Sequence, residues 1–179
     1  MAELKETHDV SINWRSFELR PGDGPPLPES YRQAILQKRP AMQQMAREHF
    51  GVEINEGPFG INSRPALVGA KYAEAMGHGP VYHEAMLRAY WQEAKDISDP
   101  TVLRQVAESV GLDGDAFMAA LDDLEYQMAV DYDIDYAHRL RISGVPALLF
   151  ENKYLVGGAQ TYDSLIDILQ QIEAAESAV

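Results

Sequence analysis

Hydrophobic positions change their spacing twice along the chain. The opening "AELKETHD" consists of good helix formers, and "DVSINWRSFEL" then places Val10, Ile12 and Trp14 at every second position. A period of two with β-branched and aromatic residues predicts a strand that has one buried face. The crowded prolines and glycines of "RPGDGPPLPES" predict a loop after it.

From residue 30 to residue 143 the apolar residues recur every three to four positions, which predicts helices. We interpret "ESYRQAILQKRPAMQQMAREHFGVEI" as two short helices separated at Pro40, because an interior proline removes a backbone donor. Another helix is expected from about Ser63, where the serine is a candidate N-cap. One more begins at Pro100 after an Asp99 cap and stops at Gly111. The segment 30–143 is therefore predicted to be all helical.

After Gly144 the pattern returns to short apolar runs. "PALLFE" and "YLVGGA" flank Asn152-Lys153, which favours a tight antiparallel hairpin. "TYDSLIDILQQIEAA" then predicts an amphipathic helix that is capped by Thr161 and covers the sheet. The order indicates an α/β fold interrupted by a helical insert, with parts at residues 1–29, 30–143 and 144–179.

Composition limits the classes of partner. A chain of 179 residues with 46% hydrophobic and 24% charged residues fits one packed domain that carries an insertion. The net charge of −13 would repel phosphate backbones and anionic lipid, so we expect neither nucleic acid nor a membrane as a partner. The first residues have neither the basic flank nor the apolar run of a signal peptide, and we expect a cytoplasmic location.

The residue types available also restrict the chemistry. The absence of cysteine excludes disulfides, thiolate metal sites and thiol nucleophiles within this chain. His78 and His83 are separated by Gly79-Pro80, a spacing that fits no zinc signature. The acidic segment "DYDIDY" lacks the glycine that a calcium loop needs at its sixth position, and we interpret it as the solvated face of a helix. No metal site is expected.

Four segments carry a resemblance to a known family: "INWRSFELRP", "GPFGINSRPALVGAKYAE", "LRAYWQEAKDISDPTVLRQVAESVGLD" and "RISGVPALLFENKYLVGGAQ". Together they resemble the DsbA-like branch of the thioredoxin superfamily, and within it the FrnE-type dithiol-disulfide isomerases. The resemblance implies a thioredoxin-like fold with an inserted all-helical domain. It also implies an ancestral activity of thiol-disulfide exchange, with a thiol or disulfide peptide or a small thiol as substrate.

The same resemblance implies where such a substrate would bind. It places the substrate-binding backbone at Gly144, Val145 and Pro146, and it implies a cis peptide bond between Val145 and Pro146. Family members begin with a strand and then carry Cys-x-x-Cys, or a serine variant, at the start of the first helix, where amide dipoles stabilise a thiolate. This chain resembles the family only from the end of that helix onward. We therefore expect no catalytic residue within it.

Several alternatives follow from this expectation. Without the first strand, the second strand and the hairpin would have unpaired edges, so the segment 9–19 could pair elsewhere, two chains could form a homodimer, or a longer native chain could exist. The chain is expected to be a homologue that is inactive in dithiol exchange. A glutathione-dependent isomerase of the hydroxychromene-carboxylate type, with glutathione as its cofactor, and a non-catalytic peptide-binding or assembly module are the alternative functions.

Overall fold

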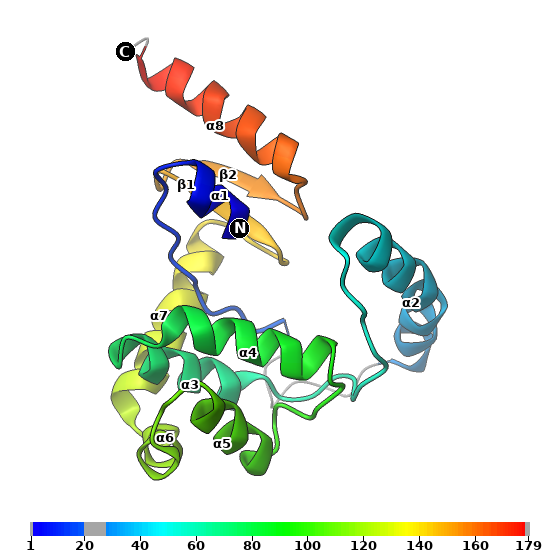
Figure 1. Cartoon of the computed structure of the whole chain (residues 1–179), viewed down its shortest axis with the longest axis vertical. Coiled ribbons are helices and arrows are strands. Elements are labelled where there is room, and N and C mark those ends of the chain that lie inside the picture. Colours follow the sequence, from blue (N-terminus) through cyan, green and yellow to red (C-terminus); the bar gives the residue numbers. More distant parts are fainter. Residues whose placement is uncertain (1, 20–27, 178–179) are drawn as a thin grey trace. The chain divides into compact units, whose positions relative to one another are not determined.

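The computed structural model describes residues 2–19 and 28–177 of the chain. Over these ranges the chain forms the following helices and strands (Figure 1): α1 (Ala2–Thr7), α2 (Glu29–Phe50), α3 (Arg64–Ala75), α4 (Gly79–Trp91), α5 (Pro100–Ser109), α6 (Gly114–Ala120), α7 (Leu124–Arg139), β1 (Ala147–Phe150), β2 (Tyr154–Gly157) and α8 (Tyr162–Ser177). Among these residues, no helix is both long and apolar enough to cross a membrane.

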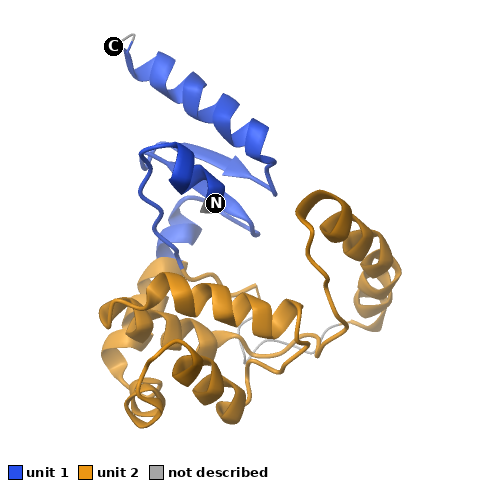
Figure 2. Ribbon diagram, viewed as in Figure 1, with its two compact units in different colours: residues 1–15, 135–179 blue, residues 16–134 orange. Residues whose placement is uncertain are grey.

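The chain divides into two compact units, which Figure 2 shows in different colours. One unit combines residues 1–15 with residues 135–179, and we call it the hairpin unit. The other consists of residues 16–134, and we call it the helical unit. Helix α7 contributes residues to both units, because the boundary falls between Ile134 and Asp135.

The helical unit has a core formed by α3, α4, α5 and α6. Its buried members come from each of these helices and from the turns between them: Ala66, Ala73, Tyr82, Ala85, Met86, Ala89, Ile97, Leu103, Val106, Ala107, Leu112 and Phe117. Small residues on α3 let the neighbouring helices approach closely. A Cβ atom on Gly69 would lie 2.5 Å from Phe117 Cζ and 2.6 Å from Tyr82 Oη, so this position has room for no side chain.

Helix boundaries in this unit follow capping chemistry. The Asp99 carboxylate accepts a hydrogen bond from the Thr101 N–H at 2.7 Å, and the Asp113 carboxylate accepts one from Ala116 at 2.8 Å. These bonds satisfy backbone donors that the first helical turn leaves without partners. The Asp99 cap was predicted from the sequence and is confirmed. Ser63 precedes α3 as expected, although its side chain makes no capping bond.

The segment predicted as two short helices is a single helix of 22 residues, and Pro40 lies inside it. The prediction was wrong because the residues beside Pro40 are strong helix formers. Gln37, Lys38 and Arg39 precede the proline, and alanine, methionine and glutamine follow it. Their propensity carries the helix through the one position where a backbone donor is absent. Gly51, at φ 64°, ends the helix as a left-handed cap.

The hairpin unit consists of the β1–β2 hairpin with α1 and α8. Strand β1 pairs antiparallel with β2, from Ala147 opposite Gly157 to Phe150 opposite Tyr154. Glu151 and Asn152 turn the chain with positive φ angles of 51° and 54°. Leu165 and Ile172 on α8 and Leu4 on α1 are buried. A hydrogen bond of 2.9 Å between Thr7 Oγ1 and Tyr162 Oη joins α1 to α8.

The strand predicted from the alternation Val10, Ile12 and Trp14 is not formed. Residues 9–18 contain no regular secondary structure, and the Trp14 side chain is 41% exposed. Within the described ranges, β1 and β2 pair only with each other, so this segment also does not pair elsewhere. A strand exists only where a neighbouring backbone supplies hydrogen-bond partners, and an alternating pattern cannot provide that neighbour. The loop was predicted at residues 20–30; residues 20–27 lie outside the described residues, and Glu29 and Ser30 belong to α2.

Candidate functional site

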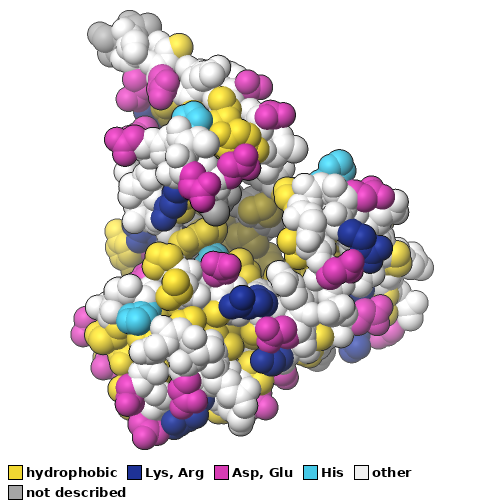
Figure 3. All heavy atoms as spheres, in the orientation of Figure 1, with side chains coloured by type: hydrophobic (Ala, Val, Ile, Leu, Met, Phe, Trp, Pro, Cys, Tyr) yellow, Lys and Arg dark blue, Asp and Glu magenta, His cyan; other side chains and the backbone are white. Residues whose placement is uncertain are grey.

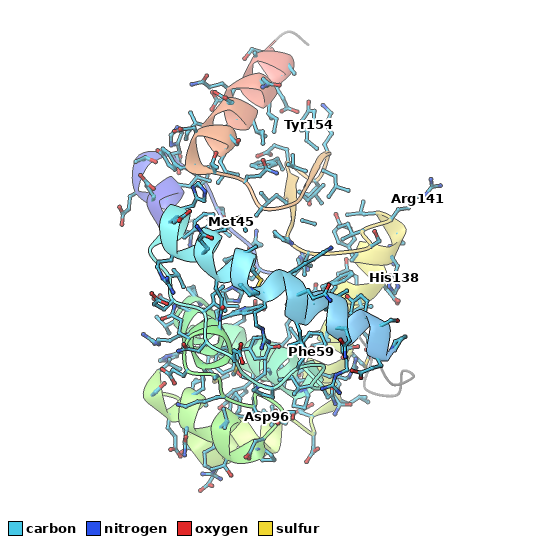
Figure 4. All side chains as sticks on the ribbon, turned by 90° about the vertical axis from the view of Figure 1, so that its right-hand side faces the viewer. Met45, Phe59, Asp96, His138, Arg141 and Tyr154 are labelled. Atoms are coloured by element: carbon cyan, nitrogen blue, oxygen red, sulfur yellow. The ribbon has the colours of Figure 1, made fainter. Side chains whose placement is uncertain are left out.

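The candidate site is the loop that leads from α7 into β1. Beyond the end of α7, the Arg141 N–H donates to the His138 carbonyl at 2.9 Å, and the Ile142 N–H donates to the Ala137 carbonyl at 3.0 Å. Arg141 takes a positive φ of 58°, which turns the chain out of the helix. Its side chain points outward from the end of the helix in Figure 4. The segment after Arg141 therefore no longer follows the axis of α7 and leads into β1 of the hairpin.

Gly144, Val145 and Pro146 are the last residues of this loop before β1, and we call them the Pro146 loop. The Val145–Pro146 peptide bond is cis. Val145 is 50% exposed, and Pro146 is exposed as well. A Cβ atom added to Gly144 would have no atom within 4 Å, so there is open space next to this glycine. The loop thus offers backbone and apolar surface to a ligand from solvent.

The turn after β2 holds the Pro146 loop in place. The Gly158 N–H donates to the Pro146 carbonyl at 2.9 Å. Gly158 has φ +87°, a conformation that side-chain-bearing residues rarely adopt. The Gln160 amide donates to the carbonyls of Gly157 and Gly158 at 3.2 Å and 3.3 Å, which ties the turn to itself. Sequence reasoning about binding did not select Gly158 and Gln160, although the paired glycines of "YLVGGAQ" are a signal for them.

The strand register shows which backbone groups of the hairpin remain unpaired in the ladder. Because Pro146 and Gly158 are a hydrogen-bonded pair, the alternation of an antiparallel ladder makes Leu148 opposite Val156 the next such pair. The N–H and C=O groups of Ala147 and Leu149 consequently point to the outer edge of β1. The described residues place no further strand on that edge. An extended chain could add there through main-chain hydrogen bonds.

The Pro146 loop and the strand that follows it carry no charge, although Arg141 lies just before them. Residues 142–150, "ISGVPALLF", contain no charged side chain. The nearest basic group on the hairpin is Lys153, at the opposite end, where its Nζ lies 3.2 Å from Glu176 Oε1. Hydrogen bonds to Tyr154 and Glu176 raise the pKa of Lys153 above its ordinary value. Gly144, Val145 and Pro146 can therefore bind a ligand through backbone groups and apolar contact, and none of the three has an acidic, basic or nucleophilic side chain.

A buried ion pair lies in the helical unit and corrects one expectation. The acidic residues of 131–136 were interpreted as a solvated face, which is wrong for Asp133, whose exposure is 1%. Its Oδ2 lies 2.7 Å from Lys71 Nζ and accepts the Ser16 N–H at 2.9 Å. A cation and a backbone donor can thus stabilise a carboxylate where the helical pattern alone indicates solvent.

A second ion pair surrounds Arg64 on the same unit. The guanidinium lies 2.5 Å from Asp131 Oδ1 and 3.6 Å from Glu18 Oε2. The hydrogen bond that the guanidinium donates to Asp131 raises the pKa of Arg64, and desolvation opposes this rise. Together with Asp133, these contacts attach the segment 16–18 to α3 and α7. Cations balance the carboxylates of Asp131 and Asp133, whereas the buried Glu18 Oε1 has no hydrogen-bond partner among the described residues.

The histidines do not form a metal centre. Over residues 2–19 and 28–177, no three side chains of the ligating types come together. His78 Nδ1 lies 2.8 Å from the Val110 carbonyl and thereby joins the start of α4 to the end of α5. His83 is half-buried, and desolvation lowers its pKa.

Comparison with known sequences identifies relatives along nearly the whole chain. Residues 1–170 match the family described as the DSBA-like thioredoxin domain. The uncharacterized protein YwbO of Bacillus subtilis is 32% identical over 159 residues, which cover 84% of this chain and 77% of YwbO.

Comparison with solved structures supports the same architecture. A probable DsbA oxidoreductase from Streptomyces coelicolor aligns with a TM-score of 0.70 and 26% identity, over 88% of this chain and 73% of that protein. A 2-hydroxychromene-2-carboxylate isomerase aligns with a TM-score of 0.74 over 99% of this chain and 85% of its own, at 20% identity, which is evidence for the fold alone. The thioredoxin-like α/β fold with an inserted helical domain, expected from the sequence, is confirmed.

Proposed function

We propose, because the chain belongs to the family of DSBA-like thioredoxin domains, that it binds a thiol or disulfide substrate at the Pro146 loop. The substrate is a disulfide-containing peptide or a small thiol, held against Gly144, Val145 and Pro146. The chain is a homologue of the FrnE-type enzymes that does not carry out dithiol exchange by itself. Its cytoplasmic location stays a prediction from the sequence.

The binding proposal rests on one observation about the backbone of the Pro146 loop. The Pro146 carbonyl is fixed by the Gly158 N–H at 2.9 Å, while Val145 beside it is 50% exposed and Gly144 faces open space. The backbone is thus held in one conformation before a ligand arrives, which lowers the entropy cost of binding. A neutral loop of this kind suits the apolar sulfur atoms and extended backbone of a disulfide-containing peptide.

The inactivity proposal rests on the chemistry of exchange. A thiolate attacks one sulfur of a disulfide, a new sulfur–sulfur bond forms, and the other sulfur leaves as a thiolate. The sequence contains no cysteine that could attack or leave. Exchange at the Pro146 loop would therefore need a thiol from outside the chain, such as a second protein or a low-molecular-weight thiol.

Insulin reduction tests the catalytic part of the proposal. With dithiothreitol as the reductant, the 179-residue chain is expected to leave the rate of insulin precipitation at the value for dithiothreitol alone. A DsbA-family protein with an intact Cys-x-x-Cys, assayed in parallel, provides the positive control. A concentration-dependent acceleration by this chain would contradict the inactivity proposal and leave the binding proposal standing.

A matched pair of variants tests the binding part. A Cβ atom at position 144 would meet no atom within 4 Å, so Gly144→Leu places an apolar side chain in this open space, and we expect it to abolish binding of a disulfide-containing peptide as followed by NMR titration. Lys153→Leu introduces the same side chain at the opposite end of the hairpin and should leave the affinity unchanged. Equal effects of the two variants, or titration shifts confined to the helical unit, would place the ligand elsewhere.

Glutathione is the alternative ligand, and the fold likeness to the chromene-carboxylate isomerase favours testing it. Titration with reduced glutathione should produce saturable shifts at residues 144–146 if the chain acts as a glutathione-dependent isomerase. Saturation with the peptide but not with glutathione supports a peptide-binding module. Saturation with glutathione alone supports the isomerase-type alternative.

A further inference from the structure

Helix α2 presents large apolar side chains to solvent. Ala46 is its only buried residue, whereas four large apolar residues on this helix are exposed: Tyr31, Leu36, Met45 and Phe50. Met45, labelled in Figure 4, is 50% exposed. A free helix of this length would gain stability by covering such residues, since exposed apolar groups of this size favour association.

Basic residues outnumber acidic ones along α2, although Arg47 is paired with Glu53 at 2.7 Å. Lys38 lies seven residues from both Tyr31 and Met45 and therefore shares their side of the helix. Arg32 is also exposed. Lys and Arg side chains and hydrophobic ones both reach the surface over α2 in Figure 3. The helix contains four Lys or Arg residues and two Glu, a net +2, in a chain whose total is −13. We call the exposed surface formed by Tyr31, Arg32, Leu36, Lys38, Met45 and Phe50 the α2 face.

Helix α7 has a surface of the opposite charge. Leu124, Met128 and Tyr132 are all exposed and follow one another at intervals of four residues, so they form one row along the helix. Exposed Asp122 and Glu125 lie at the start of that row. We call this row, with its acidic neighbours, the α7 face.

We propose that the α2 face of one copy of the chain binds the α7 face of a second copy. Outside α2 the chain carries 11 Lys or Arg residues and 26 Asp or Glu residues, a net −15. On a second copy, the exposed Asp122 and Glu125 beside the α7 row are complementary in charge to the exposed Arg32 and Lys38 on α2. The row itself offers apolar side chains to those of α2. Anionic lipid also combines negative charge with apolar groups, so binding of the chain to anionic vesicles in place of a dimer would overturn the proposal.

The proposed contact can form twice between the same two copies. If α2 of the first copy binds α7 of the second, α2 of the second can bind α7 of the first through the same residues. A two-fold dimer of this kind contains the contact twice and leaves neither face open. The charges set the register and the rate of association, while the apolar rows supply the buried area.

Molar mass as a function of salt is the first measurement. Sedimentation equilibrium or light scattering at micromolar concentrations should give a dimer in about 50 mM salt, and its dissociation constant should rise in about 500 mM salt, because exposed charge pairs are screened. Met45→Glu and Met128→Lys should each give a monomer. A monomer in the unaltered protein, or dimers that survive both substitutions, would overturn the proposal.

Charge reversal with mixing tests the pairing directly. Arg32→Glu with Lys38→Glu makes the α2 face acidic, and Asp122→Lys with Glu125→Lys makes the α7 face basic. Each double variant places like charges at both contacts, and its dimer should dissociate with a constant about tenfold higher or more. In a mixture of the two variants, one contact pairs the two reversed faces and the other pairs the two unaltered faces. The mixture should therefore dimerise with the affinity of the unaltered chain.

The mixing experiment separates the proposal from contacts within one chain. If α2 met α7 only inside its own copy, each variant would lose thermal stability and the mixture would still be monomeric. Glu29→Lys with Glu48→Lys, which adds positive charge to α2 without reversing its basic residues, serves as the control and should leave the dimer intact. A mixture that stays monomeric while both variants remain folded by circular dichroism would overturn the proposal. This inference is independent of ligand binding at the Pro146 loop.

Discussion

Asp133 is 1% exposed in the helical unit, and Lys71 Nζ balances its charge at a distance of 2.7 Å. Removing one partner of such a pair leaves the other charge buried without compensation. We predict that Asp133→Asn lowers the free energy of unfolding by about 3 kcal/mol, because the amide can still accept the Ser16 N–H but cannot neutralise Lys71. Urea denaturation followed by circular dichroism provides the measurement.

The same substitution two residues earlier is its control. Asp131 pairs with Arg64 at the surface, where its side chain is 57% exposed, and Asp131→Asn should cost less than about 1 kcal/mol. Equal losses in the free energy of unfolding for the two variants would show that burial of the carboxylate does not determine the size of the loss. Sequence alone could not distinguish these two aspartates, because both belong to one acidic run. The difference between them arises from Lys71, which lies far away in the sequence, and from the backbone of Ser16.

At the candidate site, too, the sequence alone could not predict contacts between residues that are distant along the chain. Gly144, Val145 and Pro146 were selected through a family resemblance, and their role as substrate contacts stays a prediction. The structure adds that Val145 and Pro146 are exposed and that the Gly158 N–H holds Pro146. The Gly158 contact joins residues twelve positions apart through the hairpin register, so it required the strand pairing to be known.

At the scale of helices, capping can be tested at α5 and α3. The Asp99 carboxylate accepts the Thr101 N–H at 2.7 Å, whereas Ser63 makes no side-chain bond at the start of α3. We predict that Asp99→Ala lowers the free energy of unfolding by about 1 kcal/mol, and that Ser63→Ala changes it by less than about 0.5 kcal/mol. Thermal melts of the two variants measure this difference. A larger loss for Ser63→Ala would mean that serine caps α3 in solution.

Helices and strands differed in how well the sequence predicted them. Helix α5 follows the local signals Asp99, Pro100 and Gly111, and α8 follows its Thr161 cap, which act within a few residues. The hairpin also forms locally, because its two strands are joined by a short turn. The segment 9–18 was predicted as a strand from alternation alone, and it lacks the neighbour that a strand requires. Pro40 was predicted to separate two helices, but the strong helix formers on both sides of it continue a single helix.

At the scale of the whole molecule, the two units differ in how much apolar surface they bury. The helical unit has a core of twelve clustered buried residues from α3 to α6 and the turns between them, whereas the hairpin unit buries Leu4, Ala137, Leu165 and Ile172 within the described ranges. Burial of apolar groups is the main favourable contribution to stability. The three-part division drawn at residues 29 and 143 stays a prediction, since the division by compactness concerns two units rather than three.

Native-state hydrogen exchange tests whether the smaller buried apolar surface of the hairpin unit makes the hairpin beside the Pro146 loop less stable than the helical core. Regions with few buried apolar contacts open with lower free energies, so amides of residues 147–157 should exchange about tenfold faster or more than amides of α3, α4 and α5. A disulfide-containing peptide bound at the Pro146 loop would slow exchange in the hairpin while leaving α3 to α6 unchanged, because binding stabilises the conformation that it selects. Equal protection of the hairpin and the helical core before the peptide is added would contradict the lower stability of the hairpin unit. Slower exchange in α3 to α6 upon binding would show instead that the two units respond together.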